Sequence, residues 1–368
     1  MTTREQTHDV AADQAGLAPE LPVEAATTGK KPLSRRWRRF KANKRGYYSL
    51  LIFSLLFGLS LFAELLSNDK PLVVNYQEGW YFPLLVSYPE TTFGGDFRTE
   101  TDYRDPFFRA RMAEAGNWAL FPPNPHSYDS INLELTRPVP APPSADNFLG
   151  TDDRGRDVLA RLIYGFRLSV LFGLGLTIIG TGIGIMAGAI QGYLGGRTDL
   201  FMQRFIEIWS AMPELYLLII FAAIFKPSIA LLLILLSLFG WMGLSDYVRA
   251  EFLKGRNMDY VKAAKALGVG NIRIMFRHLL PNGMTPVITF LPFRMSGAIL
   301  ALTSLDFLGL GVPPPTPSLG ELLAQGKANI VAWWLSLGTF VVLVGTLALL
   351  IFIGEALREA FDPRKTSD

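Results

Sequence analysis

Cysteine is absent from this sequence of 368 residues, and histidine occurs only three times, as His8, His126 and His278. The absence of cysteine excludes disulfide bonds, thiolate catalysis and cysteine-ligated metal sites. With so few imidazoles, a zinc site of the ordinary kind is not expected either. Charged residues make up only 18% of the chain, whereas 50% is hydrophobic and the mean hydropathy is +0.27. This composition is typical of a membrane protein.

The sequence also lacks a phosphate-binding loop of the form Gly-x-x-x-x-Gly-Lys-Ser/Thr. Gly29-Lys30 and Gly326-Lys327 have neither the preceding glycine nor the following hydroxyl. The chain is therefore not expected to bind ATP by that route. A lipid-modifying or intramembrane enzyme would need a positioned catalytic set, and neither His-Glu-x-x-His nor paired aspartates occur within an apolar run. We predict a protein without enzymatic activity, cofactor or metal of its own.

Apolar runs of about 20 residues, the length that spans a bilayer, are what the sequence has in abundance. Six such runs predict six transmembrane helices with both chain ends on the cytoplasmic side. They comprise residues 46–66, 168–192, 201–225, 227–247, 284–305 and 331–357.

The distribution of basic residues supports this orientation. Residues 30–45 contain nine Lys or Arg and no acidic residue, directly before the first apolar run. Residues 249–277 contain seven Lys or Arg against two acidic residues, whereas 306–330 contain only Lys327. The positive-inside rule places the first two segments in the cytoplasm. A nucleic-acid-binding arm is the competing interpretation of 30–45, but the adjoining span explains the cluster, so no nucleic acid partner is expected.

The resulting division has five parts. Residues 1–45 form a cytoplasmic tail, disordered over 1–29 and basic thereafter, and 46–66 form the first helix. Residues 67–166 form a long external segment, which is either an inert insertion or a surface that meets a substrate-delivery protein. Residues 167–358 form the core of five helices, and 359–368 form a second cytoplasmic tail.

Residues 249–280 within this core predict two short helices joined by a turn. Ala263, Ala264 and Ala266 offer a small-residue face that another protein can approach closely, Gly268 stands at a helix end, and Pro281 opens the next element. The segment resembles the cytoplasmic coupling loop of ATP-binding-cassette (ABC) importer permeases, with the pattern Glu-Ala-Ala, three residues, Gly, nine residues, Ile, one residue, Leu-Pro. The residues that carry this resemblance are Tyr260, Lys262, Ala263, Ala264, Gly268, Arg277, His278, Pro281 and Asn282.

Two of these positions depart from the general pattern and favour a particular branch. Lys262 replaces the glutamate and His278 the isoleucine. The tyrosine before the alanines and the Arg-His-x-x-Pro-Asn run resemble the oligopeptide and dipeptide permeases. Lys262 is either a solvated surface residue or a salt-bridge partner of an ATPase, and His278 is either a contact residue or a helix cap.

Further blocks carry the same resemblance over residues 149–363. They are Leu149-Gly150-Thr151-Asp152-Asp153-Arg154-Gly155-Arg156-Asp157, Tyr193-Leu194-Gly195-Gly196-Arg197, Leu305-Asp306-Phe307-Leu308-Gly309-Leu310-Gly311 and Gly354-Glu355-Ala356-Leu357-Arg358. The stretch Gly79-Trp80-Tyr81-Phe82-Pro83 is similar to the subgroup that imports microcin C, a peptide-nucleotide antibiotic, and other oligopeptides.

This resemblance implies a type I ABC importer permease of the bacterial inner membrane. Its expected partners are a second permease, two ATPase subunits that use ATP and Mg²⁺, and a periplasmic substrate-binding protein. An ion-coupled secondary transporter is the alternative, but such transporters often carry an inverted repeat, and none is visible here.

Two features of the apolar runs suggest sites. Gly180, Gly184, Gly188 and Gly192 form one glycine face, either for packing within the subunit or for a surface that slides or meets the second permease. Glu214 and Arg294 are expected near the middle of the third and fifth spans, where unpaired charges are costly. They either pair with each other or line the translocation path, where Arg294 would attract a peptide carboxylate and Glu214 an amino terminus.

Overall fold

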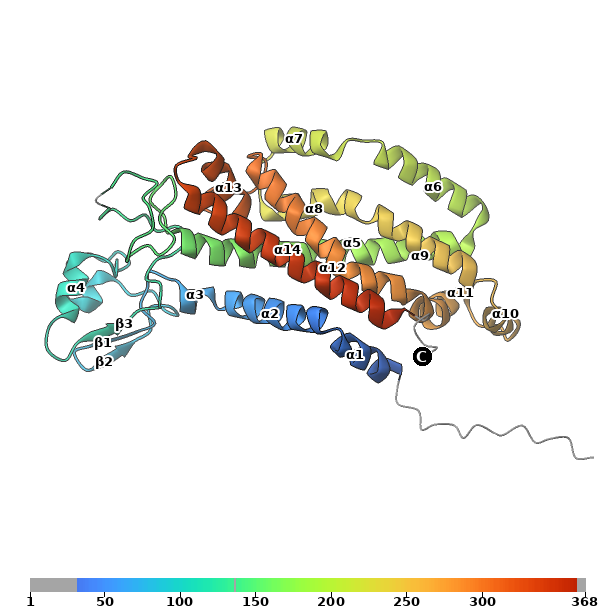
Figure 1. Ribbon diagram of the computed structural model, residues 1–368, viewed down its shortest axis with the longest axis horizontal. Coiled ribbons are helices and arrows are strands. Elements are labelled where there is room, and N and C mark those ends of the chain that lie inside the picture. Colours follow the sequence, from blue (N-terminus) through green and yellow to red (C-terminus); the bar gives the residue numbers. More distant parts are fainter. Residues whose placement is uncertain (1–31, 136, 363–368) are drawn as a thin grey trace, which may run out of the picture.

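The computed structural model describes residues 32–135 and 137–362 and consists mostly of helices arranged as an elongated bundle (Figure 1). A small sheet lies at one end of the bundle, hereafter the sheet end, and helix α10 lies at the other, hereafter the α10 end. In the described residues, four helical stretches are long and apolar enough to cross a membrane. They are Val158–Leu194, Ile229–Gly255, Asn271–Phe307 and Trp333–Phe361.

The second stretch comprises α8 (Ile229–Gly240) and α9 (Met242–Gly255), and α14 is the fourth. A fifth candidate is the pair α6 (Gly196–Ser210) and α7 (Glu214–Ile224), which is bent by 66°. The predicted run 201–225 is therefore broken, because Pro213 has no backbone N–H with which to continue α6.

The predicted count of six spans is not confirmed. The first predicted run, 46–66, is divided between α2 (Lys44–Leu61) and α3 (Ala63–Leu66), and it is not among the stretches that meet the length and hydropathy criteria. The interruption lies at Phe62, whose φ of −104° and ψ of 37° are not helical. The 18 residues of α2 also begin with two cations, Lys44 and Arg45, so its uninterrupted apolar part is short.

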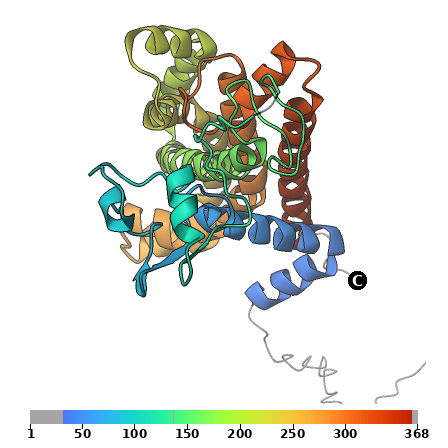
Figure 2. The same cartoon turned by 90° about the vertical axis from the view of Figure 1, so that its left-hand side faces the viewer.

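Helix α5 (Val158–Leu194) is the central element of the bundle. It packs against α9 and α8 on one side and against α12 (Leu280–Phe307), α14 and α2 on the others. Apolar side chains from α5, α12 and α14 form one core cluster, and those from α5, α8 and α12 form another. Seen from the sheet end in Figure 2, α6 and α7 stand at the outer edge of this arrangement.

The helix that follows α10 (Asp259–Ala266) begins earlier than the sequence predicts. It starts with α11 (Asn271–Arg273), continues through η2, a π-helical stretch at Ile274–Leu279, and then becomes α12. Pro281 is the second residue of α12, directly after the π-helical stretch, and the chain is helical on both sides of it, so it does not open a separate element. The second short helix that was predicted before Pro281 is thus the start of one long helix.

Segment 67–166 contains a three-stranded antiparallel sheet of order β2-β1-β3, which the sequence analysis did not predict. Its strands are β1 (Val73–Tyr76), β2 (Gly79–Tyr81) and β3 (Trp118–Leu120), with Asn75 opposite both Trp80 and Trp118. The short helices η1 (Glu90–Phe93) and α4 (Pro106–Met112) pack beside it around a cluster of aromatic rings centred on Phe93. This cluster gives the segment an apolar core of its own.

Candidate functional site

The predicted loop site lies on and after α10, at one end of the bundle. Val261 and Ala264 point inward and pack with Ile274 in a core cluster, whereas Tyr260 and Ala263 are exposed. Ala264 therefore does not belong to an exposed small-residue face, because its helical register places it one turn from Val261 on the buried side. Exposed Lys262 forms an ion pair with Asp259 at 3.2 Å on the same helix.

Gly268 ends α10 in a left-handed conformation. Its φ is +76°, and its N–H donates to the Lys265 carbonyl at 3.0 Å while the Val269 N–H donates to the Ala264 carbonyl at 3.0 Å. Glycine suits this position because it has no Cβ to oppose a positive φ. The turn exposes Leu267 by 84%.

The remaining predicted loop residues lie along the long helix. Arg277, Pro281 and Asn282 are exposed and His278 is partly buried. The Asn282 side chain donates to the His278 carbonyl at 2.9 Å, so His278 receives this bond through its backbone.

These residues share one surface with several exposed apolar side chains. We name it the α10 surface, comprising the exposed residues Met258, Tyr260, Lys262, Ala263, Leu267, Gly268, Ile272, Phe276, Arg277, Pro281 and Asn282. Exposed apolar groups bordered by cations are typical of a protein interface. The surface is attached to the centre of the bundle, since the Tyr193 hydroxyl at the end of α5 donates to Asn271 at 2.7 Å.

A cavity of about 530 Å³ contains the two ionisable residues predicted within the membrane. Arg294 lies near the middle of α12, whereas Glu214 stands in the first turn of α7, at the bend of the broken pair. Both line the cavity, but the ion pairs of the described residues do not join them. Glu214 and Arg294 therefore do not form the ion pair that was one of the two hypotheses.

Arg294 is held instead by a neighbouring backbone carbonyl. Its Nη2 donates to the Gly240 carbonyl at 2.8 Å, where α8 ends. A Cβ added to Gly180 would lie 2.7 Å from that same nitrogen, so the glycine leaves the space that the guanidinium occupies. The Arg294 guanidinium, the cavity, the end of α8 and the start of α7 therefore lie close together.

The other three glycines of the predicted glycine face, Gly184, Gly188 and Gly192, face α9 within the same chain. A Cβ on Gly184 would lie 2.9 Å from the Trp241 carbonyl, and one on Gly192 would lie 2.6 Å from the Phe252 Cβ. At Gly188 it would overlap the Ser245 carbonyl. All three are buried. The sequence left open whether these glycines serve packing within the subunit or a surface that slides or meets a second permease. The geometry fits packing within the subunit.

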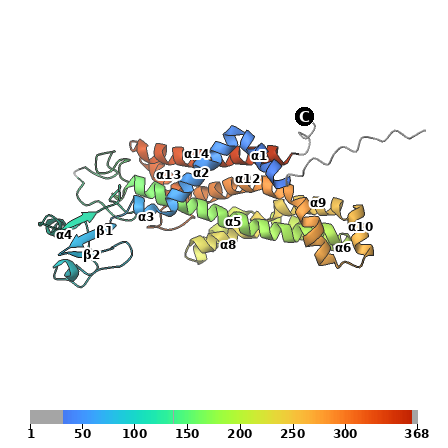
Figure 3. The same cartoon turned by 90° about the horizontal axis from the view of Figure 1, so that it is seen from below.

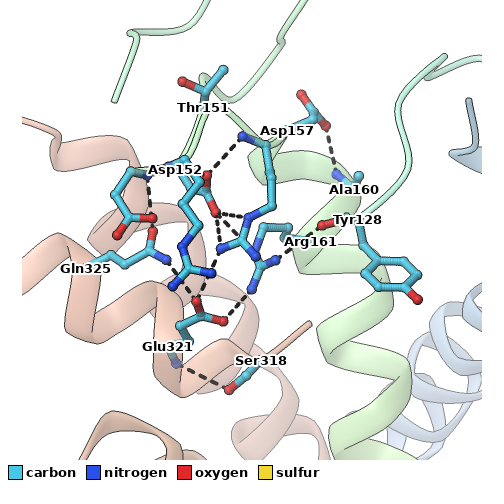
Figure 4. Close-up of polar contacts among 12 residues, drawn as sticks. Tyr128, Thr151, Asp152, Asp157, Ala160, Arg161, Ser318, Glu321 and Gln325 are labelled. Atoms are coloured by element: carbon cyan, nitrogen blue, oxygen red, sulfur yellow. Dashed lines mark hydrogen bonds and ion pairs between the residues drawn. The ribbon is translucent and has the colours of Figure 1, made fainter. Parts of the chain in front are cut away.

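A buried charged network at the sheet end was missed by the sequence analysis. It comprises Asp152, Arg156, Arg161 and Glu321. Figure 4 shows Asp152, Arg161 and Glu321 converging. Arg161 on α5 is fully buried and contacts Glu321 at 2.5 Å and the Tyr128 carbonyl at 3.2 Å. Arg156 contacts Asp152 at 2.6 Å and Glu321 at 3.2 Å. We call these four residues the sheet-end network.

The network joins the start of α5 to α13 (Leu319–Ala328), which packs between α12 and α14. Burial lowers the pKa of Arg156, but its hydrogen bond to Asp152 and the charges of Asp152 and Glu321 outweigh that effect and raise the pKa above its usual value. The close spacing of Asp152, Arg156 and Arg161 in the chain was a signal for a local cluster. Nothing in the sequence indicated that Glu321 completes it.

Among residues 32–135 and 137–362, no group of three or more His, Asp or Glu side chains is placed to hold a metal ion. What the described residues do provide is a cavity with a cation, a surface suited to a protein partner, and a continuous helix that carries parts of both. This combination is suited to binding.

Two family models match the chain. Residues 180–367 match "Binding-protein-dependent transport system inner membrane component", and residues 31–80 match "N-terminal TM domain of oligopeptide transport permease C". The first match contains the α10 surface, the long helix and all the residues that line the cavity except Leu176 and Thr177.

Several curated relatives are similar over most of their length. The "Inner membrane ABC transporter permease protein YejE" of Escherichia coli (strain K12) is 54% identical over 330 residues, covering 90% of this chain and 96% of the relative. The "Peptidoglycan transport system permease protein YejE" of Agrobacterium fabrum is 51% identical, covering 95% and 96%. The "Oligopeptide transport system permease protein OppC" of Haemophilus influenzae is 36% identical, covering 65% and 77%.

Proposed function

The chain belongs to the family of binding-protein-dependent inner membrane permeases, in the oligopeptide branch of ABC importers, and from this premise we propose that it conducts peptides or peptide-like compounds. The fold is that of a type I ABC importer permease. No observation on the chain favours the ion-coupled secondary transporter. The names of the relatives support oligopeptides and peptidoglycan-derived compounds as the class of cargo. Microcin C is proposed only from the resemblance carried by Gly79-Trp80-Tyr81-Phe82-Pro83.

The observation that carries this proposal is the continuous helix Asn271–Phe307. Its first turns contribute to the α10 surface, and Arg294 on the same helix lines the cavity. Along the axis of this helix, His278 and Arg294 are about 24 Å apart. A partner that pushes or tilts the α10 surface therefore moves one wall of the cavity, which is the coupling that alternating access requires.

We assign the α10 surface to an ATPase subunit. The ATP and Mg²⁺ used in transport would be bound by that partner. Two ATPase subunits would serve one pair of permeases, and hydrolysis would reset the pair after each delivery. The basic residues of 30–45 and 249–277 support a cytoplasmic location for this surface and for both chain ends, in an inner membrane.

A second permease is proposed to cover α6 and α7. These helices stand at the edge of the bundle (Figures 1 and 2). They expose apolar side chains along both their lengths, so they are suited to a helical partner. The exposed set comprises Leu200, Phe201, Phe205, Ile208, Leu215, Tyr216, Ile219, Ile220, Ile224 and Phe225. The cavity lies beside α7, so a second subunit there would close the path. Segment 67–166, at the opposite end from α10, would then meet the periplasmic substrate-binding protein.

Arg294→Met tests the proposed cargo contact. The Arg294 guanidinium would bind the carboxylate of a peptide in the cavity, and a hydrogen bond to a charged group contributes about 1.5–3 kcal/mol, or roughly tenfold to a hundredfold. We expect uptake of a peptide with a free carboxyl terminus to fall about tenfold or more. Uptake of the same peptide with an amidated terminus should change by about twofold at most, because its terminus carries no charge. The assay is uptake of both peptides by vesicles that contain the complete importer.

The matched control is Arg358→Met, which makes the same change at an exposed position in the last turn of α14, outside the cavity, the α10 surface and segment 67–166. It should leave both rates unchanged. Unaltered uptake and charge preference in Arg294→Met would show that Arg294 holds the helices together without touching cargo.

A further inference from the structure

Helix α1 (Pro32–Ala42) and the first turn of α2 carry a dense group of cations. Seven Lys or Arg occur between residues 35 and 45, and no acidic residue lies among them. The group comprises Arg35, Arg36, Arg38, Arg39, Lys41, Lys44 and Arg45. In the described part of the chain, the ion pairs leave all seven without a carboxylate partner within 4 Å. Within the described residues, their mutual repulsion is therefore not offset by a direct ion pair.

Helix α1 is nevertheless fixed in place against the α10 end of the bundle (Figure 3). Phe40 is 2% exposed and packs on Ala356 and Ala360 near the end of α14. The Arg36 guanidinium lies over the Phe361 ring at 4.6 Å. At the junction of α1 and α2, the Asn43 side chain donates to Glu359 at 2.8 Å. The cations are thus held on a docked helix and not on a free tail.

The position of α1 coincides with one boundary of the apolar region. The apolar sequence of α2 begins directly after Arg45, and two aromatic side chains near this point, Trp37 and Tyr48, are 49% and 58% exposed. Lys41 lies over the Trp37 ring at 5.4 Å. Exposed Trp and Tyr beside Lys and Arg are characteristic of the headgroup layer of a bilayer.

We propose that α1 and the first turn of α2 form a binding site for anionic phospholipid headgroups such as phosphatidylglycerol. A phosphodiester supplies the negative charge that the protein does not provide, and its oxygens accept hydrogen bonds from guanidinium groups in a fork geometry. The aromatic rings would lie at the level of the glycerol backbone. Because α1 packs on α14, bound lipid would stabilise the contact between the two helices. The site is separate from the cavity and from the α10 surface.

The test compares lipids retained by the purified full chain. The chain is placed in nanodiscs of phosphatidylcholine and phosphatidylglycerol, and native mass spectrometry gives the ratio of the two lipids bound to it. For the wild type, we expect phosphatidylglycerol to be enriched about fivefold or more over the bilayer ratio, because each cation near the surface contributes to the attraction. Raising the salt to about 0.5 M should reduce this enrichment, because screening weakens electrostatic binding.

Three variants distinguish the site from a general effect of net charge. Changing exposed Arg35, Arg38 and Arg45 together to Gln should bring the enrichment to within about twofold of the bilayer ratio. Changing all three to Lys keeps the charge but removes the fork geometry, so the enrichment should lie between those of the wild type and the Gln variant. The matched control changes Lys254, Lys262 and Arg273, three exposed cations elsewhere, to Gln and should preserve the wild-type enrichment.

Equal enrichment in the wild type and the α1 Gln variant would overturn the proposal. Equal loss in the control variant would also overturn it, since the attraction would then follow net charge alone. If the wild type showed no enrichment of phosphatidylglycerol at low salt, the lipid proposal would be wrong, and α1 would instead bind a protein. If the triple Gln variant does not fold, Arg35→Gln and Lys254→Gln make the same comparison one cation at a time. Arg35→Gln should lower the enrichment more than Lys254→Gln, and equal effects would overturn the proposal.

Discussion

Glu321→Ala is expected to lower the free energy of unfolding by about 3–5 kcal/mol, the usual effect of removing one partner from a buried ion pair. Glu321 accepts from the guanidinium groups of both Arg156 and Arg161. Its removal leaves two cations with Asp152 as their only nearby carboxylate in the sheet-end network. Arg161 is fully buried and the Glu321 side chain is only 19% exposed, so water can replace the lost carboxylate only in part.

The measurement is unfolding of the purified chain in detergent, followed by heat and by denaturant. Glu114→Ala is the matched control, because Glu114 forms an exposed ion pair with Arg111 at 2.9 Å. Exposed pairs of this kind contribute about 1 kcal/mol at most, so this variant should unfold almost like the wild type. If the two variants lost equal stability, the sheet-end network would be no more important than a surface pair.

Gly188→Val is expected to be comparably damaging, for a steric reason. The new Cβ would overlap the Ser245 carbonyl and lie 2.8 Å from the Val248 Cβ and 2.9 Å from the Arg249 nitrogen, so α5 and α9 would have to separate. Overpacking within a core typically costs about 1–3 kcal/mol, and a backbone atom cannot move aside as a side chain can. We expect a loss of about 3 kcal/mol or more, at the upper end of that range.

The readout is the yield of monodisperse protein and its melting temperature. Gly182→Val provides the control on the same helix, because a Cβ at Gly182 meets no heavy atom within 4 Å. It should give near wild-type yield. Normal behaviour of Gly188→Val would mean that α5 and α9 are not held at the distance described.

Features that depend on local sequence could be predicted, whereas long-range contacts could not. The cap at Gly268 follows from the preference of glycine for positive φ, and the close approach at Gly188 follows from glycine recurring every fourth residue. The prediction that Ala264 belongs to an exposed small-residue face was wrong, since Ala264 faces inward and packs with Ile274. Glu321 lies 160 residues from Arg161, a distance at which a single sequence contains no pairing signal.

The bend at Pro213 illustrates a related limit. Hydropathy averaged over 201–225 is high enough for a span, but averaging conceals one proline that interrupts the helix. The bend places Glu214 in the wall of the cavity at the start of α7, and not in the middle of a straight helix. The sheet in segment 67–166 was missed because its strands have only three or four residues.

The central claim is that this permease is driven by an ATPase docked on the α10 surface. We would test it by purifying the tagged chain from native membranes under mild extraction, as wild type, Ala263→Arg and Ala145→Arg. Ala263 is exposed on α10, and Ala145 is equally exposed on segment 67–166, so the two substitutions are matched. The account predicts that ATP hydrolysis accompanies the wild type and Ala145→Arg but not Ala263→Arg. A folded wild-type chain that brings no ATPase, or an Ala263→Arg chain that brings as much as the wild type, would contradict it.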